Sequence, residues 1–483
     1  MVSPPRMRLA AIISGILILV LITCAFTTSL KSPTINFLTS PPEIPNQQFH
    51  LLLPATGINV DLCKLVLSAA ITGYPKPILL GWGGHGQYNG SESHLFKISE
   101  TLSYLDNLTP AADDDLVLVL DAYDIWLQLR PDVLIKRYHA AIEKANTRLK
   151  REGIHGADHG GATIKQSILF GPDKICWPYD ERRAACWAVP HSSLGPDVFG
   201  PATDTWMVAN RPRWLNSGTI MGPAQDMRVM FAGTMGVLRR KYDEAFDFRS
   251  SDQYYFQEML AEQEIGRLEL RNGTVEAPLL YDDVRGMVPD IPTNARTEFH
   301  VALDYESDVF QTSAAYSEYL TWMSFNHSTP VLGQASGRTK RMDQMVLSED
   351  IENSFPPFGI SQTDEALPTG KGWADLMLGT NMITQRVFPV WHMTGEKSFR
   401  SRWWPRMWFH PLAEALLNAS KREAAGWKKG ARVVAKVNGT SYTGAGMKGK
   451  EGHLAAGVGV WTDQGTFMPW DSMCSTYSEE LFL

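Results

Sequence analysis

Two aspartates, Asp121 and Asp124, have the spacing of a metal-binding pair. They follow a run of five aliphatic residues, 116 to 120, which is typical of a strand buried on both faces of a parallel sheet. Asp121 falls where this strand should end, and ligands of open α/β sheets bind beyond the carboxyl ends of strands. Two carboxylates on such a turn can hold a hard divalent cation. The alternative is an ordinary loop acid at Asp121 and a helix N-cap at Asp124.

The sequence around this pair predicts alternating strands and helices. Apolar runs predict strands at 50–53, 77–82 and 167–170, and helical spacing predicts helices at 62–72, 96–108 and 133–149. Such alternation is typical of a layered α/β domain with a mixed, mainly parallel sheet flanked by helices. Farther along, residues 400–417 predict one more helix packed against the core.

The composition limits the class of protein. The chain has 483 residues, of which 44% are apolar and 20% charged, with a formal net charge of -7. This length accommodates one large domain with attachments, or two domains, with a sizeable core. The charge is spread along the chain without a strong basic patch, which argues against a nucleic-acid partner.

The N-terminus predicts a membrane anchor. Arg6 and Arg8 precede an apolar run that begins at Leu9, and the order of charge and apolar run puts the short N-terminus in the cytosol. We expect a cytosolic tail at 1–8, a transmembrane helix at 9–29 and a flexible Pro/Ser-rich stem at 30–47. The chain would then be a single-pass type II membrane protein with a lumenal catalytic domain in the Golgi or the endoplasmic reticulum. A cleaved signal peptide is the alternative.

A lumenal domain would be open to glycosylation and disulfide formation. Candidate glycan sites are the sequons at Asn89, Asn272, Asn326, Asn418 and Asn438. The short separation of Cys176 and Cys186 predicts a disulfide, with two free thiols as the alternative. The sequence leaves open whether Cys63 and Cys474 pair.

Four motifs in a fixed order point to a known family. They are 116–124, then 168–170 with 175–178, then Trp214-Leu215-Asn216-Ser217-Gly218, then Ser251-Asp252-Gln253. This order resembles the glycosyltransferase domain of procollagen lysyl hydroxylases and the related collagen-type galactosyltransferases, over roughly residues 48 to 315. The resemblance implies a GT-A fold, a Rossmann-like sheet that binds a UDP-sugar through a metal ion. No hydroxylase domain is present.

The third metal ligand is expected far downstream. The segment from Val390 to Lys397 resembles the closing His-x-x-Gly-x-x-Lys segment of glycogenin-type GT-A enzymes. This resemblance implies that His392 joins Asp121 and Asp124 in binding Mn²⁺ and that Lys397 meets the diphosphate, although here the lysine follows Gly395 by two residues. One imidazole and two carboxylates suit Mn²⁺. The alternative for His392 is a buried structural histidine.

The resemblance also implies the remaining roles. Asp252 would orient or deprotonate the acceptor hydroxyl, with a helix N-cap as its alternative. Expected donor contacts are Thr56, Lys97, Asp121 and Lys397. Expected acceptor or sugar contacts are Trp177, Asn216, Ser217, Gly218 and Gln253. The alternatives are an ordinary turn at 216–218 and a core position for Trp177.

These features predict the domain limits and the function. The GT-A domain would span 48–426 with a mobile insertion at about 333–372, followed by a C-terminal annex at 427–483. The expected activity is metal-dependent transfer of a hexose from a UDP-sugar to a hydroxyl of a glycan or protein. One alternative is a catalytically inactive, membrane-anchored carbohydrate-binding protein with the same fold. A haloacid-dehalogenase-like phosphatase is disfavoured because Tyr123 stands where its second aspartate is needed.

Overall fold

The computed structural model describes residues 46–88, 94–280, 285–326, 345–359, 366–425, 432–445 and 457–483. The expected tail, anchor and nearly all of the stem therefore lie outside the described residues, as does Asn89. Within the described residues, no helix combines the length and apolar composition that a bilayer crossing needs. The chain from Pro45 onward forms one compact unit.

A mixed β-sheet organises this unit. In the described residues it has ten strands, and eight of them follow one another in the order β18-β17-β2-β1-β3-β8-β7-β9. Their bounds are β18 (Phe467–Pro469), β17 (Gly459–Thr462), β2 (Ile78–Leu80), β1 (Asn46–Pro54), β3 (Leu116–Leu120), β8 (Trp214–Pro223), β7 (Ile168–Asp173) and β9 (Val301–Leu303). Strands β17, β2, β1 and β3 run parallel, whereas β8 is antiparallel to β3 and β7. The α/β class with a mixed sheet, predicted from the sequence, is confirmed.

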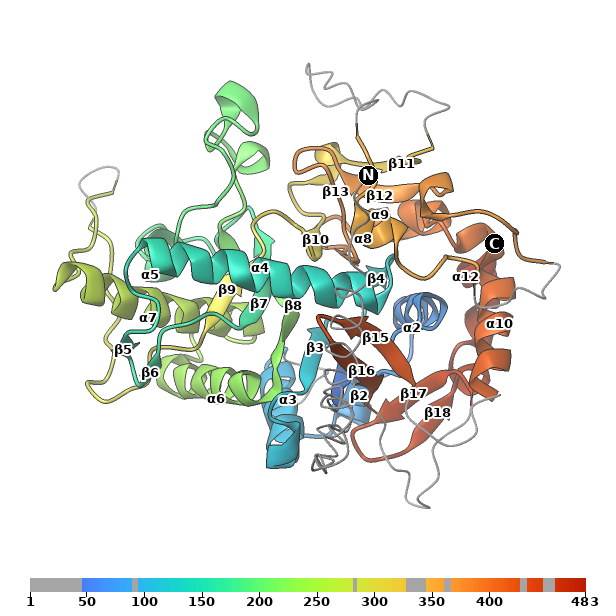
Figure 1. Ribbon diagram of the computed structural model, residues 1–483. Helices are drawn as coiled ribbons and strands as arrows, with labels where there is room; N and C mark the ends of the chain where they lie inside the picture. The colour runs from blue at the N-terminus through green and yellow to red at the C-terminus, as the bar shows by residue number, and fades with distance from the viewer. Residues whose placement is uncertain are drawn as a thin grey trace, which may run out of the picture. The chain divides into compact units, whose positions relative to one another are not determined.

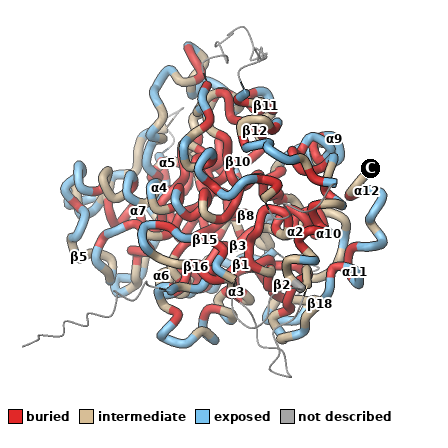
Figure 2. The backbone as a smooth tube through the Cα atoms, turned by 45° about the vertical axis from the view of Figure 1, so that its right-hand side comes forward, coloured by how far each residue is buried: buried red, intermediate tan, exposed pale blue. Residues whose placement is uncertain are grey.

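Strand β3 separates two apolar cores, which explains its uninterrupted aliphatic run. Leu116, Leu118 and Leu120 belong to the first core, and Val117 and Val119 belong to the second. Alternate residues of a strand point to opposite faces of the sheet, so both faces of β3 must be apolar. Figure 2 shows buried residues gathered along β1, β3 and β8.

Helices cover both faces of the sheet (Figure 1). The first core includes residues of α2 (Val60–Thr72), α4 (Pro131–Arg151) and α10 (Ala413–Ala425), and the second includes residues of α3 (Phe96–Asp106), α6 (Ala224–Lys241) and α7 (Asp252–Asn272). Local signals fix both ends of α2: the Asn59 side chain accepts a hydrogen bond from Leu62 N at 2.9 Å, and Gly73 ends the helix with φ 83°.

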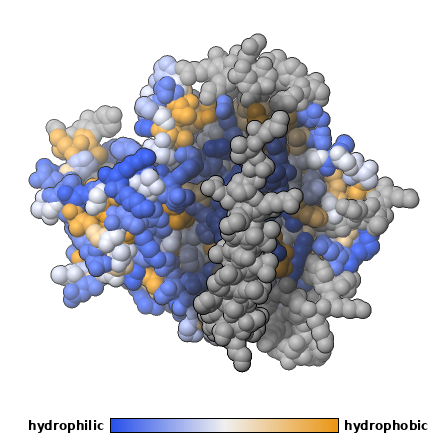
Figure 3. Space-filling model, in the orientation of Figure 1, coloured by the Kyte–Doolittle hydropathy of each residue, from blue (hydrophilic) through white to orange (hydrophobic). Residues whose placement is uncertain are grey.

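The surface on the side of α4 is mostly hydrophilic, with small hydrophobic groups (Figure 3).

A second, small sheet brings distant segments to the end of β3. It has the order β10-β14-β4, with β10 at Phe310–Thr312, β14 at Val390–His392 and β4 at Ile125–Leu127. In this sheet His392 pairs with Ile125, the residue after Asp124. Asp124 therefore precedes a strand, and its alternative as a helix N-cap is wrong.

The C-terminal segment extends the central sheet. Strands β15 (Val433–Val437) and β16 (Thr440–Gly444) form a hairpin, and β16 pairs with β1 while β17 pairs with β2. These strands are red in Figure 1, near β2. A disulfide joins Cys63 of α2 to Cys474, so this pair is oxidised. The segment expected as an annex is thus built into the same compact unit as the rest of the domain.

The expected helix at 400–417 is interrupted. The chain forms α9 (Ser398–Trp403) and then α10, which begins at Ala413. Pro405 and Pro411 lie between the two helices, and proline lacks the N–H that a continuous helix needs. The prediction of one continuous helix is therefore wrong.

Part of the expected mobile insertion is packed against the core. Residues 333–344 and 360–365 lie outside the described residues, but α8 (Glu349–Glu352) contacts α4. The buried guanidinium of Arg137 forms a bidentate ion pair with Asp350 and donates to the Ser348 hydroxyl and to the carbonyls of Asp308 and Val387. Arg137 is therefore the anchor of this segment.

We expect Arg137→Ala to lower the free energy of unfolding by about 3–5 kcal/mol, because it leaves the Asp350 carboxylate without its ion-pair partner. Arg137→Lys should recover only part of this loss, since an ammonium cannot pair with the carboxylate in a bidentate manner. Urea denaturation measures the difference. Lys136→Ala, at the exposed neighbouring position, is the control, and equal effects at 136 and 137 would contradict the assignment.

Candidate functional site

Three potential metal ligands meet beyond the end of β3. Asp121 directly follows β3, Asp124 precedes β4, and His392 ends β14. The Nε2 atom of His392 lies 3.2 Å from Asp124 Oδ1 and 3.8 Å from Asp121 Oδ2. One ligand atom from each residue lies within 4.8 Å of the others. The side chains that the sequence predicted to share a cation are therefore close enough to do so.

Gly218 of β8 makes this approach possible. A Cβ atom on Gly218 would lie 2.1 Å from His392 Cε1 and 2.8 Å from Asp121 Oδ2. The Gly218 carbonyl accepts a hydrogen bond from Asp121 N at 2.9 Å, which fixes the turn. Among the described residues, the buried His392 Nδ1 has no hydrogen-bond partner. The Nε2 atom of the imidazole thus faces the two carboxylates, and the three side chains could together hold a metal ion.

Lys97 of α3 links the metal ligands to Asp252. Its buried ammonium lies 2.7 Å from Asp121 Oδ1 and 2.5 Å from Asp252 Oδ2, and it donates to the Ser217 carbonyl at 3.0 Å. Burial acts to lower the pKa of Lys97, but the two carboxylates outweigh burial and raise it. The residue is therefore a fixed positive charge between two acids.

Arg400 of α9 holds the other side of the site. Its guanidinium lies 3.3 Å from Asp124 Oδ2 and also contacts Asp61 and the Tyr123 carbonyl. Burial acts to raise the pKa of Asp124, but His392 and Arg400 outweigh it and hold the pKa below its usual value.

Burial likewise acts to lower the pKa of His392, and Asp124 and Asp121 outweigh it, so that pKa is raised. A cation binds only the neutral imidazole, so a raised pKa makes protons compete with the cation for His392.

The three ligands line a pocket of about 470 Å³. Nine residues singled out from the sequence line this one pocket: Asp121, Asp124, Trp177, Asn216, Ser217, Gly218, Asp252, Gln253 and His392. Gly395, from the segment expected to supply His392, also lines it, and the sequence argument missed His94, Asp247, Phe248, Ser250 and Thr394. Asp247 and Phe248 stand four and three residues before the Ser251-Asp252-Gln253 motif, which was the available signal. Arg400, also missed, follows His392 by eight residues.

Three predicted donor contacts lie elsewhere. Lys97 is behind the pocket wall, bonded to protein acceptors. Thr56 follows β1, and its N–H donates to the Tyr123 hydroxyl at 3.0 Å. Lys397 is exposed at the start of α9 and does not line the pocket.

Asn216 organises the pocket floor. Its Oδ1 accepts from Gly218 N at 3.0 Å, and its Nδ2 lies 3.4 Å from Asp173 Oδ2 and 3.5 Å from Gln253 Oε1. The segment 216–218 is part of β8 rather than an ordinary turn, so the turn alternative is wrong. Burial raises the pKa of Asp173 to about 6, although hydrogen bonds from Asn216 and Lys174 N oppose the rise.

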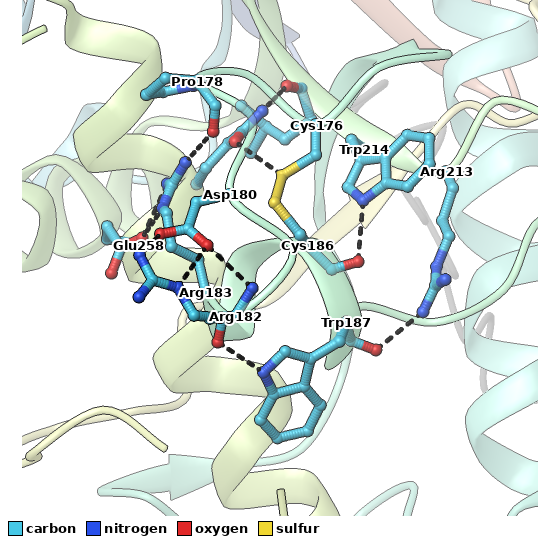
Figure 4. Close-up of a disulfide and its surroundings, with 12 residues drawn as sticks. Cys176, Pro178, Asp180, Arg182, Arg183, Cys186, Trp187, Arg213, Trp214 and Glu258 are labelled. Atoms are coloured by element: carbon cyan, nitrogen blue, oxygen red, sulfur yellow. Dashed lines mark hydrogen bonds and ion pairs between the residues drawn. A yellow bond between two sulfur atoms is a disulfide. The ribbon is translucent and has the colours of Figure 1, made fainter. Parts of the chain in front are cut away.

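A disulfide closes the loop that carries Trp177. Cys176 and Cys186 are joined, as the sequence predicted, and Figure 4 shows how neighbouring side chains hold this loop. Arg183 pairs with Glu258 of α7, and the indole N–H of Trp214 donates to the Cys186 carbonyl at 3.1 Å. Trp177 is 46% exposed and lies edge-to-face with Phe248, with ring centroids 5.2 Å apart. Because Trp177 is this exposed, the alternative of a core position is wrong. The two rings form an aromatic wall of the pocket.

Four of the predicted glycan sites lie in the described residues, and all four asparagines are exposed: Asn272, Asn326, Asn418 and Asn438.

Comparison of the sequence with protein-family models finds no match, and comparison with curated proteins finds none.

We expect Gly218→Ala to abolish Mn²⁺ binding, because the added methyl group would occupy the space of the His392 ring. Gly372→Ala is the matched control, since a Cβ atom there meets no atom within 4 Å. Electron paramagnetic resonance of Mn²⁺ measures the bound fraction. Wild-type affinity in Gly218→Ala would contradict the assignment.

Asp173→Asn should change how stability depends on pH. An unfolded aspartate ionises near its ordinary pKa of 3.8, whereas folded Asp173 ionises at about 6. Between these values the folded state binds more protons, so this residue's contribution to stability falls as pH rises and levels off above about pH 7. The stability of the asparagine variant relative to wild type should therefore increase from pH 4 to pH 7 by about 2 kcal/mol. A difference that is equal at pH 4 and pH 7 in urea denaturation would contradict this.

Proposed function

We propose that the chain is a metal-dependent glycosyltransferase with a GT-A fold, which transfers a hexose from a UDP-sugar to a hydroxyl acceptor. The observation that carries the proposal is the meeting of Asp121, Asp124 and His392 at the end of β3, in a pocket that also contains Asp252. Ligands of open α/β sheets bind at this edge. The choice of uridine diphosphate and of a hexose comes from the resemblance in the sequence motifs.

Asp121, Asp124 and His392 would hold Mn²⁺. The bound ion would neutralise charge that develops on the diphosphate leaving group. Arg400 holds one oxygen of Asp124, so the carboxylate keeps a fixed orientation toward the other two ligands. The protein thus supplies a rigid donor set.

Asp252 would act on the acceptor. It begins α7 at the pocket wall, where its Oδ2 pairs with Lys97. The Lys97 ammonium holds the carboxylate in place, and a carboxylate here can accept a hydrogen bond from an attacking hydroxyl and orient it. Because the same ammonium contacts Asp121, the base and the metal ligand have a fixed separation.

The remaining walls suit a sugar. Asn216 and Ser217 bring hydrogen-bonding groups to the pocket, and Trp177 with Phe248 forms an aromatic wall of the same pocket. Polar groups and an aromatic surface in one pocket match the mixed character of a hexose ring. The acceptor hydroxyl would enter between this wall and Asp252.

The proposal includes the cellular compartment in which the domain works. The two disulfides favour an oxidising environment, and the exposed asparagines could receive glycans. We infer that the domain works in the lumen of the Golgi or the endoplasmic reticulum, attached by the apolar segment at 9–29.

Asp124→Ala and His392→Ala should each reduce Mn²⁺-dependent UDP-sugar hydrolysis at least ~100-fold while leaving the protein folded. The double variant should be no worse than either single variant, because the residues act as one unit. A screen of UDP-sugars with and without Mn²⁺ measures this. His155→Ala, at an exposed histidine outside the pocket, is the control. Additive losses, or wild-type activity in either variant, would contradict the shared site.

A further inference from the structure

Four parallel strands end at the same edge of the central sheet, in the order β17, β2, β1, β3. Asp121 lies at the end of β3, Thr56 near the end of β1, Gly81 at the end of β2 and Asp463 at the end of β17. The C-terminal segment therefore contributes one of the four strand ends on the side of the metal ligands.

Hydrogen bonds connect these strand ends in sequence. The Tyr123 hydroxyl, from the loop of the metal ligands, accepts from Thr56 N at 3.0 Å. The Thr56 carbonyl accepts from Gly83 N at 3.1 Å. Asp463 Oδ2 then accepts from Gly81 N at 2.7 Å. A continuous set of contacts therefore joins the metal-binding loop to the C-terminal segment.

The turn after β2 has a backbone that only glycine adopts readily. Gly81, Gly83 and Gly84 have φ values of 66°, 76° and 77°. Glycine allows such conformations and a close approach of the backbone to a ligand. The Glu100 carboxylate accepts from Gln87 N at 3.2 Å, so it holds the far end of this turn while Asp463 holds the near end.

We propose that this C-terminal segment completes the nucleoside end of the donor site and that Asp463 is the residue that positions the glycine turn. The inference rests on the proposed function. The diphosphate would lie at Asp121, Asp124 and His392. The pocket for sugar and acceptor opens toward β8 and α7, on one side of β3. The nucleoside must then extend to the other side, across the ends of β1, β2 and β17.

A comparison of two variants distinguishes the contribution of the Asp463 hydrogen bond from that of its negative charge. Asp463→Asn keeps an oxygen that can accept from Gly81 N, whereas Asp463→Ala removes it. Burial, with Glu100 nearby, raises the pKa of Asp463, so a neutral amide is a mild replacement. Asp471→Ala is the control in the same segment, because its carboxylate is exposed and pairs only with Lys421 among the described residues.

Binding of UDP in the presence of Mn²⁺, measured by calorimetry on the full chain, provides the first test. Asp463→Ala should weaken UDP binding at least tenfold, Asp463→Asn less than threefold, and Asp471→Ala not at all. Binding of Mn²⁺ alone should be unchanged. In turnover, Asp463→Ala should raise the KM for the UDP-sugar with little change in kcat, which general destabilisation would not produce.

Hydrogen exchange gives a readout that needs no ligand. Amides of residues 79–88 should exchange faster in Asp463→Ala than in wild type. If Asp463→Ala fails to fold, Gly465→Ala strains the turn between β17 and β18 that carries Asp463, because Gly465 has a φ of 77°. It should weaken UDP binding in the same direction.

Unchanged UDP binding in Asp463→Ala would overturn the role of Asp463 alone. Wild-type protein that binds Mn²⁺ but not UDP would overturn the proposed function, and the nucleoside assignment with it.

Discussion

The ammonium of Lys97 between Asp121 and Asp252 is the interaction on which the site depends. Four acids line one pocket, and the mutual repulsion of three of them, Asp121, Asp124 and Asp252, must be offset at close range; the fourth is Asp247. Lys97 offsets it from one side and Arg400 from the other. Because Lys97 is buried, its charge acts in surroundings where water screens it weakly. The two cations therefore stabilise a pocket in which several carboxylates lie close together.

Close packing of strands makes this charge arrangement possible. The backbone N–H of Asp121 donates a hydrogen bond to the Gly218 carbonyl. Only a glycine at position 218 leaves room for the imidazole of His392. His392 reaches the site because β14 pairs with β4, directly after Asp124. The metal ligands thus depend on two sheets meeting at the end of β3.

Features that depend on local pattern were predictable from the sequence. The aliphatic run of β3 faces two cores, so its composition alone indicated a buried strand. Two long-range contacts were not predictable: nothing near Asp463 or Arg400 signals that these residues reach Gly81 and Asp124. The prediction of one helix at 400–417 rested on the apolar content of this segment, but its two prolines interrupt the helix.

The most direct test of the central claim is the position of the cation. Crystals of the protein grown with Mn²⁺ and UDP should show one anomalous scattering peak within about 2.0–2.3 Å of an oxygen of Asp121, an oxygen of Asp124 and His392 Nε2. The same peak should disappear in crystals of His392→Ala. A peak bound to the aspartates without His392, or a peak elsewhere, would contradict the three-ligand site and the function built on it.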